Sequence, residues 1–141
     1  MGVHGMNDEY TCEGAAADGH VECLKYAHEN GCPWGNGTCE ASATYGHFEC
    51  LKYAHENGCP WDENTCWVAA WKGHLGCLKY AHENGCPWNQ SVCCYAAITG
   101  HLEVLKYAIE NGCPGDIDYL LGVGTSQIKA WIQDFKTQSN A

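Results

Sequence analysis

Positive charge is scarce in this chain of 141 residues. Seven lysine and arginine residues stand against 17 aspartate and glutamate residues, which gives a formal net charge of −10 at pH 7. A nucleic-acid-binding face needs clustered cations to displace the counterions of the phosphate backbone, and anionic membrane surfaces attract basic segments. The composition therefore argues against nucleic acid and against a membrane as partners.

Long apolar runs and the features of an export signal are also missing. No apolar stretch approaches the roughly 18 residues that identify a membrane-spanning helix. Residues 1–20 lack the basic start and the apolar core of a signal peptide, and Met6 stands where a myristoylation motif at Gly2 would have serine or threonine. We therefore expect an intracellular, cytoplasmic protein in a reducing compartment. In such a compartment, the 12 cysteines of this chain would bind metal more often than form disulfides.

The common sequence motifs of catalysis are missing too. The sequence contains no Gly-x-Ser-x-Gly, no glycine-rich phosphate loop and no His-Glu-x-x-His. A catalytic zinc also needs an open coordination position, which a repeated set of four ligands would not leave. We therefore expect a protein that is not an enzyme.

The chain is dominated instead by an internal repeat. The segment CLKYAHENGCPW occurs at 23–34, 50–61 and 77–88, a period of 27 residues, and a divergent copy, VLKYAIENGCPG, occupies 104–115. Such a period predicts one repeat domain over residues 1–141 with a non-repetitive C-terminal cap at 117–141. The four predicted units are 11–37, 38–64, 65–91 and 92–116.

Each unit predicts two short helices. The second spans about 21–30 in the first unit and ends at Gly31, which suits a left-handed residue, before Pro33. Helices this short are marginal alone, so they must stack on the neighbouring units. The first helix of a unit begins at a threonine that could serve as its N-cap, namely Thr11, Thr38 or Thr65. It stops at a glycine, namely Gly19, Gly46, Gly73 or Gly100.

The C-terminal cap predicts one more helix. Thr125 or Ser126 can begin it. Its apolar residues recur at i, i+3, i+4 and i+7, so that one face closes the end of the stack: Ile128, Trp131, Ile132 and Phe135.

The fourth unit carries the clearest family resemblance. Residues 96–106 read Ala-Ala-Ile-Thr-Gly-His-Leu-Glu-Val-Leu-Lys, and Glu110-Asn111-Gly112 follows. This string resembles the ankyrin repeat, in a short, Cys/His-rich variant similar to those of large DNA viruses and protists. The resemblance implies an all-α fold, an α-solenoid of four stacked helix-turn-helix units with a C-terminal capping helix, which binds proteins and performs no chemistry.

The unit length departs from the family. An ankyrin repeat has about 33 residues, and these units have 27. The missing residues fall between Trp34 and Thr38, where the family has its β-hairpin finger.

The first three units share the spacing Cys-x10-Cys-x4-His-x3-Cys. In the fourth unit Val104 and Ile109 replace the second cysteine and the histidine together, as the loss of a shared metal site predicts. Three thiolates and one imidazole form a closed tetrahedral zinc site, so we predict about three structural Zn²⁺ ions per chain. The predicted ligands are Cys12, Cys23, His28, Cys32, Cys39, Cys50, His55, Cys59, Cys66, Cys77, His82 and Cys86, with Cys93 as a further candidate.

The composition of each site stays open at this point. Cys39 could complete the first site from the next unit, and Cys93 could do so for the third. Cys23, Cys50 and Cys77 are the weakest candidates, because each lies five residues before its histidine along the helix. The resemblance places all four positions in an apolar core, so unligated packing is one alternative to zinc. Disulfides or another metal are a second alternative for these cysteines. For the protein as a whole, the alternative function is metal buffering by its thiols.

Two further sets of residues suggest structural and binding roles. A histidine follows glycine in every unit and predicts a turn or cap role: His20, His47, His74 and His101. Positions late in the first helix vary between otherwise copied units, and aromatic residues there are typical of binding hot spots. Packing between units is the alternative for these side chains. We expect a monomer whose protein partner is unknown and which binds through Tyr45, Trp67, Trp71 and Lys72.

Overall fold

The computed structural model describes residues 9–140, and the regular secondary structure in this range is entirely α-helical. The all-α prediction is therefore confirmed for this part of the chain. None of these helices is both long and apolar enough to cross a lipid bilayer. The helices are α1 (Glu9–Asp18), α2 (Val21–Glu29), α3 (Asn36–Thr44), α4 (Phe48–Glu56), α5 (Glu63–Lys72), α6 (Leu75–Glu83), α7 (Gln90–Thr99), α8 (Leu102–Glu110), α9 (Ile117–Val123) and α10 (Ser126–Ser139).

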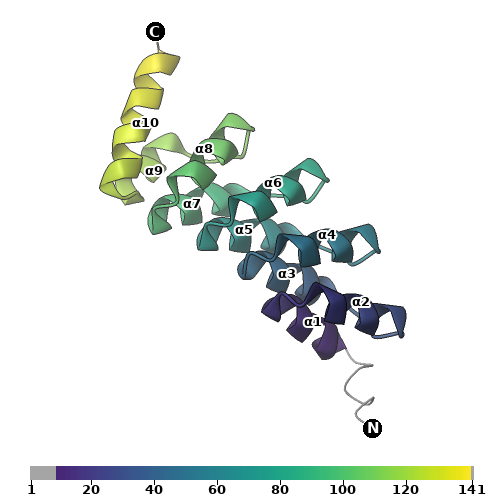
Figure 1. Ribbon diagram of the computed structural model, residues 1–141. Coiled ribbons are helices and arrows are strands. Elements are labelled where there is room, and N and C mark those ends of the chain that lie inside the picture. Colours follow the sequence, from purple (N-terminus) through teal and green to yellow (C-terminus); the bar gives the residue numbers. More distant parts are fainter. Residues whose placement is uncertain (1–8, 141) are drawn as a thin grey trace.

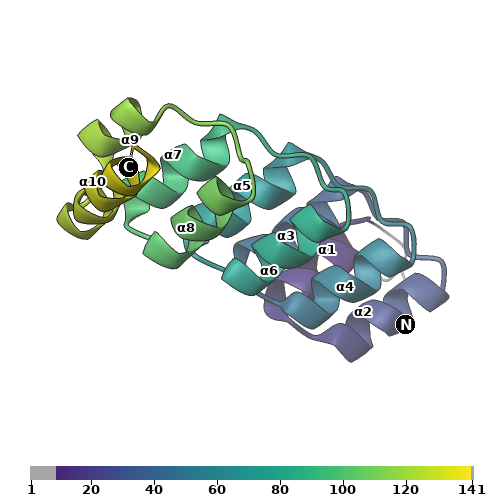
Figure 2. The same ribbon diagram turned by 90° about the horizontal axis from the view of Figure 1, so that it is seen from above.

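The helices form a repeating stack of pairs. Figure 1 shows the pairs α1/α2, α3/α4, α5/α6 and α7/α8 following one another, with α1 and α10 at opposite ends of the stack. The first helices of the pairs contact one another in the order α1, α3, α5, α7, and the second helices form a parallel layer of α2, α4, α6 and α8 (Figure 2). Helix α9 continues the first layer by packing on α7, and α10 packs on α9.

The core is the same small set of side chains in every pair. The second helix buries a leucine and, three residues later, an alanine, because positions i and i+3 share one helix face. Small residues of the first helices, such as Ala43 and Ala70, are also fully buried and let the layers approach closely. The buried leucines are Leu24, Leu51, Leu78 and Leu105, and the buried alanines are Ala27, Ala54, Ala81 and Ala108.

In the first three pairs, a histidine of the next pair packs on the turn between the two helices, whereas Thr125 takes this place at Gly100 of the fourth pair. Gly19 has φ +76°, and a Cβ built on it would lie 2.6 Å from the ring of His47. The rings of His74 and His101 stand in the same way over Gly46 and Gly73. These histidines occupy N-cap positions, but their side chains make no capping hydrogen bond. Their role is therefore packing across the unit boundary.

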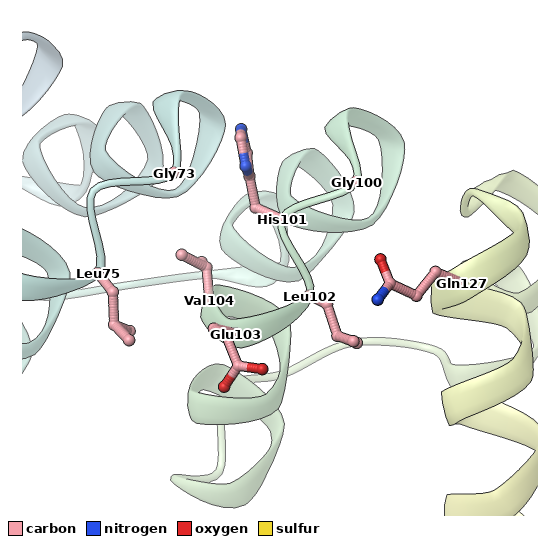
Figure 3. A pocket seen from close by; sticks show the side chains of 8 residues that line it. All are labelled: Gly73, Leu75, Gly100, His101, Leu102, Glu103, Val104 and Gln127. Atoms are coloured by element: carbon pink, nitrogen blue, oxygen red, sulfur yellow. The ribbon is translucent and has the colours of Figure 1, made fainter.

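Figure 3 shows this turn at His101, beside a hollow of about 320 Å³. Gly73 and Gly100 of successive turns line the hollow together with Glu103 and Gln127. The same glycine–histidine contact recurs at two other turns of the stack. We therefore interpret the hollow as a feature of the packing between units and not as a binding site.

The predicted threonine N-caps are wrong. Helix α3 follows Gly35, and α5 and α7 follow Asp62 and Asn89, whose side-chain oxygens accept hydrogen bonds from backbone N–H groups two residues later. Short aspartate and asparagine side chains reach these N–H groups, so the helices begin before the threonines. Thr38 and Thr65 consequently lie fully buried inside the first turns. Thr11 likewise lies inside α1.

The C-terminal cap has two helices where the sequence predicted one. Asp116 accepts hydrogen bonds from the N–H groups of Asp118 and Tyr119 and so begins α9, which the sequence analysis missed. The predicted cap of α10 is confirmed, because Thr125 Oγ1 accepts from Ile128 N at 3.4 Å. The predicted apolar face is confirmed as well. It consists of buried Ile128 and Ile132 and of Trp131 stacked on Phe135.

Candidate functional site

The four predicted zinc ligands of each unit lie in three different places. Two of the cysteines meet where the first helix begins and the second helix has ended. The Cys12 thiol donates to the Cys32 carbonyl oxygen at 3.8 Å, and Cys39 and Cys66 repeat this contact at 4.0 Å with the carbonyls 20 residues later. We call the four sets the thiol pairs: Cys12/Cys32, Cys39/Cys59, Cys66/Cys86 and Cys93/Cys113.

In three of the thiol pairs, the second cysteine ties the end of a helix pair to the start of the same helix pair. The Cys59 thiol donates to the Gly35 carbonyl oxygen at 3.2 Å, and Cys86 donates to Asp62 at 3.2 Å. Cys113 makes the equivalent bond to Asn89 at 3.4 Å. The acceptors are the N-cap residues of the first helices, so these thiols satisfy carbonyl groups at the helix starts.

The two cysteines of a pair influence each other's ionisation. A hydrogen bond to Cys59, together with burial, raises the pKa of Cys39 well above its ordinary value. Cys93 behaves in the same way, whereas the pKa of its partner Cys113 is lowered because Cys113 accepts the hydrogen bond from Cys93. Cys86 of the next pair also contributes to the raised pKa of Cys39, which indicates that successive pairs lie near one another along the stack.

The predicted histidine ligands lie elsewhere, in aromatic clusters. His28 stacks on Trp34 with ring centroids 3.9 Å apart and ring planes inclined by 13°. Tyr53 of the next unit meets both rings edge-on, at 6.0 and 6.1 Å. The same three-ring cluster recurs as His55/Trp61/Tyr80 and as His82/Trp88/Tyr107.

This stack accounts for a sequence change that had suggested metal. The fourth unit has Ile109 in place of the histidine and Gly115 in place of the tryptophan, so both members of the stack are lost together. The sequence analysis had paired the loss of the histidine with Val104 instead. Val104 is buried in the core, where a cysteine or a valine can pack.

The third place is the interface between units. Cys50 lies in one buried cluster with Cys12 and Leu24 of the preceding unit, and burial raises its pKa. Burial also raises the pKa of Cys77, to about 11. Cys23 is exposed because no helix pair precedes α1 and α2 in the described range. These cysteines therefore follow the packing of the stack.

The geometry does not gather the predicted ligands into zinc sites. Between residues 9 and 140, no group of three or more histidine, cysteine, aspartate or glutamate side chains is arranged to hold a metal ion. Each unit brings two thiols together and turns its histidine to a tryptophan, whereas structural zinc needs four ligands around one point. Zinc binding stays a prediction, and the donors as placed do not fit it.

Exposed aromatic side chains gather on the layer of first helices. Trp67 and Trp71 of α5 lie 5.8 Å apart between ring centroids, and Tyr95 of α7 lies 5.0 and 6.5 Å from them. Lys72 places its ammonium group 4.5 Å from the centroid of the Trp71 ring. The Trp67 indole also donates to Asn64 at 2.7 Å, which holds the half-buried base of the cluster. We call Trp67, Trp71 and Tyr95 the aromatic cluster.

Tyr45, the remaining predicted partner residue, lies at another point of the same layer. It is 58% exposed and lines a hollow of about 390 Å³ between α1 and α3. The carboxylates of Glu13, Asp18 and Glu40 line the same hollow. This end of the layer is therefore acidic.

Tyr95 was missed by the sequence analysis. Its position is occupied by Gly14, Ala41 and Val68 in the other units, so variation between the copies would have revealed it. The variable positions used to predict binding residues are those of Cys94, Ile98 and Thr99 in the fourth unit, and they do not include Tyr95.

A scan against protein-family models and a search of curated proteins both give no match. The resemblance to the ankyrin repeat therefore depends on the residues of the repeat itself.

Proposed function

We propose that this chain is a non-enzymatic α-solenoid of ankyrin-like units that binds a protein partner through its layer of first helices. The observation that supports it is the aromatic cluster, in which Trp71 and Tyr95 leave 40% and 38% of their surface exposed on adjacent helices. Large aromatic rings exposed side by side are typical of the residues that dominate binding energy in protein interfaces.

The charge of the layer indicates the chemistry of the partner. The chain carries a formal charge of −10, and Glu13, Asp18 and Glu40 lie together at the N-terminal end of the layer. Opposite charges accelerate association and select among partners. The partner segment we propose therefore carries lysine or arginine beside an apolar or aromatic side chain. Such binding weakens as the salt concentration rises.

A displayed library of random peptides, selected against the full chain, tests this function. We expect enrichment of peptides with basic and apolar residues. Trp71→Ala and Tyr95→Ala should each weaken the selected peptides about tenfold, the usual effect of truncating a hot spot. The matched control is Tyr119→Ala on α9, a tyrosine outside the cluster that is 51% exposed. Peptides that bind the Trp71 and Tyr95 variants as well as the parent chain would contradict the proposal.

Zinc stabilisation is a separate hypothesis with its own test. To join a thiol pair at a metal, His28, His55 and His82 would have to leave their tryptophan stacks. Elemental analysis of the purified chain should give about three Zn²⁺ if each of the first three units holds a closed site. A chelator would then reduce the helical circular-dichroism signal. If the chain keeps its full helicity after the metal is removed, metal buffering by the thiols becomes the favoured function.

A further inference from the structure

The four thiol pairs have the same spacing but different surroundings. In each of the first three units, a tryptophan stands two residues after the second member of the thiol pair, and it stacks on the histidine of that unit. In the fourth unit this position is Gly115, and Ile109 replaces the histidine. The pair Cys93/Cys113 therefore has no aromatic stack beside it.

The exposed fraction of the second cysteine of the pair also differs. Cys113 is 8% exposed, whereas its counterparts Cys32, Cys59 and Cys86 are 3–4% exposed. Gly115 also lies directly against Cys93, because a Cβ on this glycine would be 3.3 Å from Cys93 Cβ and 3.5 Å from Cys93 Sγ. A glycine without a side chain thus lies against Cys93, at the sequence position where the other units have a tryptophan.

We propose that Cys93 and Cys113 form a reversible disulfide by exchange with low-molecular-weight disulfides, while the thiol pairs of the first three units stay reduced. Cys113 has the larger exposed fraction of the two, 8% against 0% for Cys93, and is the sulfur that the small molecule reaches. Cys93 is fully buried, but it acts only within the chain. It holds the position of Cys12, Cys39 and Cys66, whose thiols each reach the carbonyl oxygen of the pair partner at 3.8–4.0 Å.

The exchange balances in two steps. Cys113 loses its proton, and its sulfur attacks one sulfur of the small disulfide, forming a mixed disulfide. One small thiolate leaves and takes up a proton. Cys93 then loses its proton and attacks the Cys113 sulfur, which releases the second small thiol. The two cysteines are oxidised by two electrons, and one small disulfide is reduced to two thiols.

The new bond would join residues that already lie together. Cys93 stands in the first turns of α7, and Cys113 follows α8 and bonds the Asn89 carbonyl at the start of α7. The disulfide therefore closes the fourth unit, on which α9 packs.

The experiment uses the full chain, reduced and then mixed with oxidised glutathione. Cys23 is exposed and Cys94 half-buried, so Cys23→Ser and Cys94→Ser are introduced first to remove competing thiols. We expect loss of two hydrogen atoms by intact mass, a Cys93–Cys113 cross-link by peptide mapping, and reversal by dithiothreitol. The fourth pair should oxidise at least about tenfold faster than any other, because access controls exchange.

Two variants distinguish this reaction from general oxidation. Cys93→Ser should stop at a glutathione adduct on Cys113, because the resolving thiol is gone. His82→Ile with Trp88→Gly gives the third unit the residues of the fourth, and a second cross-link, Cys66–Cys86, should then form. A cross-link that appears first in another pair, or a parent chain that keeps the glutathione adduct, would overturn the proposal.

Discussion

His55 stacks on Trp61 with ring centroids 3.8 Å apart and ring planes inclined by 13°. Tyr80 of the next unit meets the histidine ring edge-on at 5.8 Å. The histidine therefore contributes to packing between units as a flat ring. A metal ligand needs its ring nitrogen atoms, whereas a stacked ring needs only a flat aromatic shape. A flat ring without nitrogen atoms can therefore replace a stacked histidine but not a ligand.

His55→Ala should lower the free energy of unfolding by about 1–2 kcal/mol, because it removes one aromatic pair and its edge contact. His55→Phe keeps a flat ring and should recover most of the loss. Urea unfolding of both variants provides the measurement, and His20→Ala, at an exposed histidine, is the control. If phenylalanine is as damaging as alanine, the imidazole nitrogens matter and the zinc hypothesis gains support.

Gly46→Ala should destabilise the stack more than Gly58→Ala. Both glycines have positive φ, +76° and +88°, so both variants incur the backbone cost of about 1 kcal/mol. Only at Gly46 would the new Cβ also meet a ring, at 2.6 Å from His74, whereas nothing lies within 4 Å at Gly58. We expect a further loss of about 1–3 kcal/mol from this clash in thermal or urea unfolding. The added loss should disappear in the background His74→Ala, and its persistence there would exclude the ring contact as its cause.

Thr65→Val should stabilise the protein by about 1 kcal/mol. The Thr65 hydroxyl is buried and has no hydrogen-bond partner, so folding removes it from water without compensation. The chain supplies its own precedent, because Val92 holds the same position in the fourth unit and is fully buried. Val92→Thr is the matched reverse variant and should lower stability. A stabilising threonine at position 92 would contradict this reasoning.

Stability should fall as the pH rises from about 9 to about 11. Burial raises the pKa of Cys77 above its ordinary value of 9.0, to about 11. Below pH 9 the thiol is protonated in both states, and its contribution to stability is complete. Above pH 9 the unfolded chain loses this proton first, so the free energy of unfolding decreases until the folded thiol also ionises, by about 2–3 kcal/mol in all.

Cys77→Val, which copies Val104, should flatten this part of the pH profile. Urea unfolding at several pH values, with a reducing agent present, gives the comparison. Cys23→Val serves as the control, because Cys23 is exposed and the same substitution there removes no buried thiol. An unchanged slope in the Cys77 variant would show that other groups cause the loss of stability.

Much of the fold could be predicted from the sequence because it is local and copied. The spacing of Leu51 and Ala54 defines one buried helix face, and Gly58 needs a left-handed backbone that ends the helix. The period of 27 residues repeats these local instructions, so the helix pairs and their order follow directly. The helix starts were less predictable, because Asp62 and Thr65 are both good caps and only hydrogen-bond geometry distinguishes them.

The partners of the histidines were decided by the tertiary structure. His28 and Cys32 stand four residues apart, a spacing that suggests one site, but the chain reverses at Gly31, where φ is +87°. That reversal carries Trp34 back onto the His28 ring, and the next unit adds Tyr53 to the cluster. Sequence spacing describes neighbours along one helix. The chain reversal within the unit turned the imidazole towards the indole and left the thiols in pairs, and the packing of the next unit added the third ring.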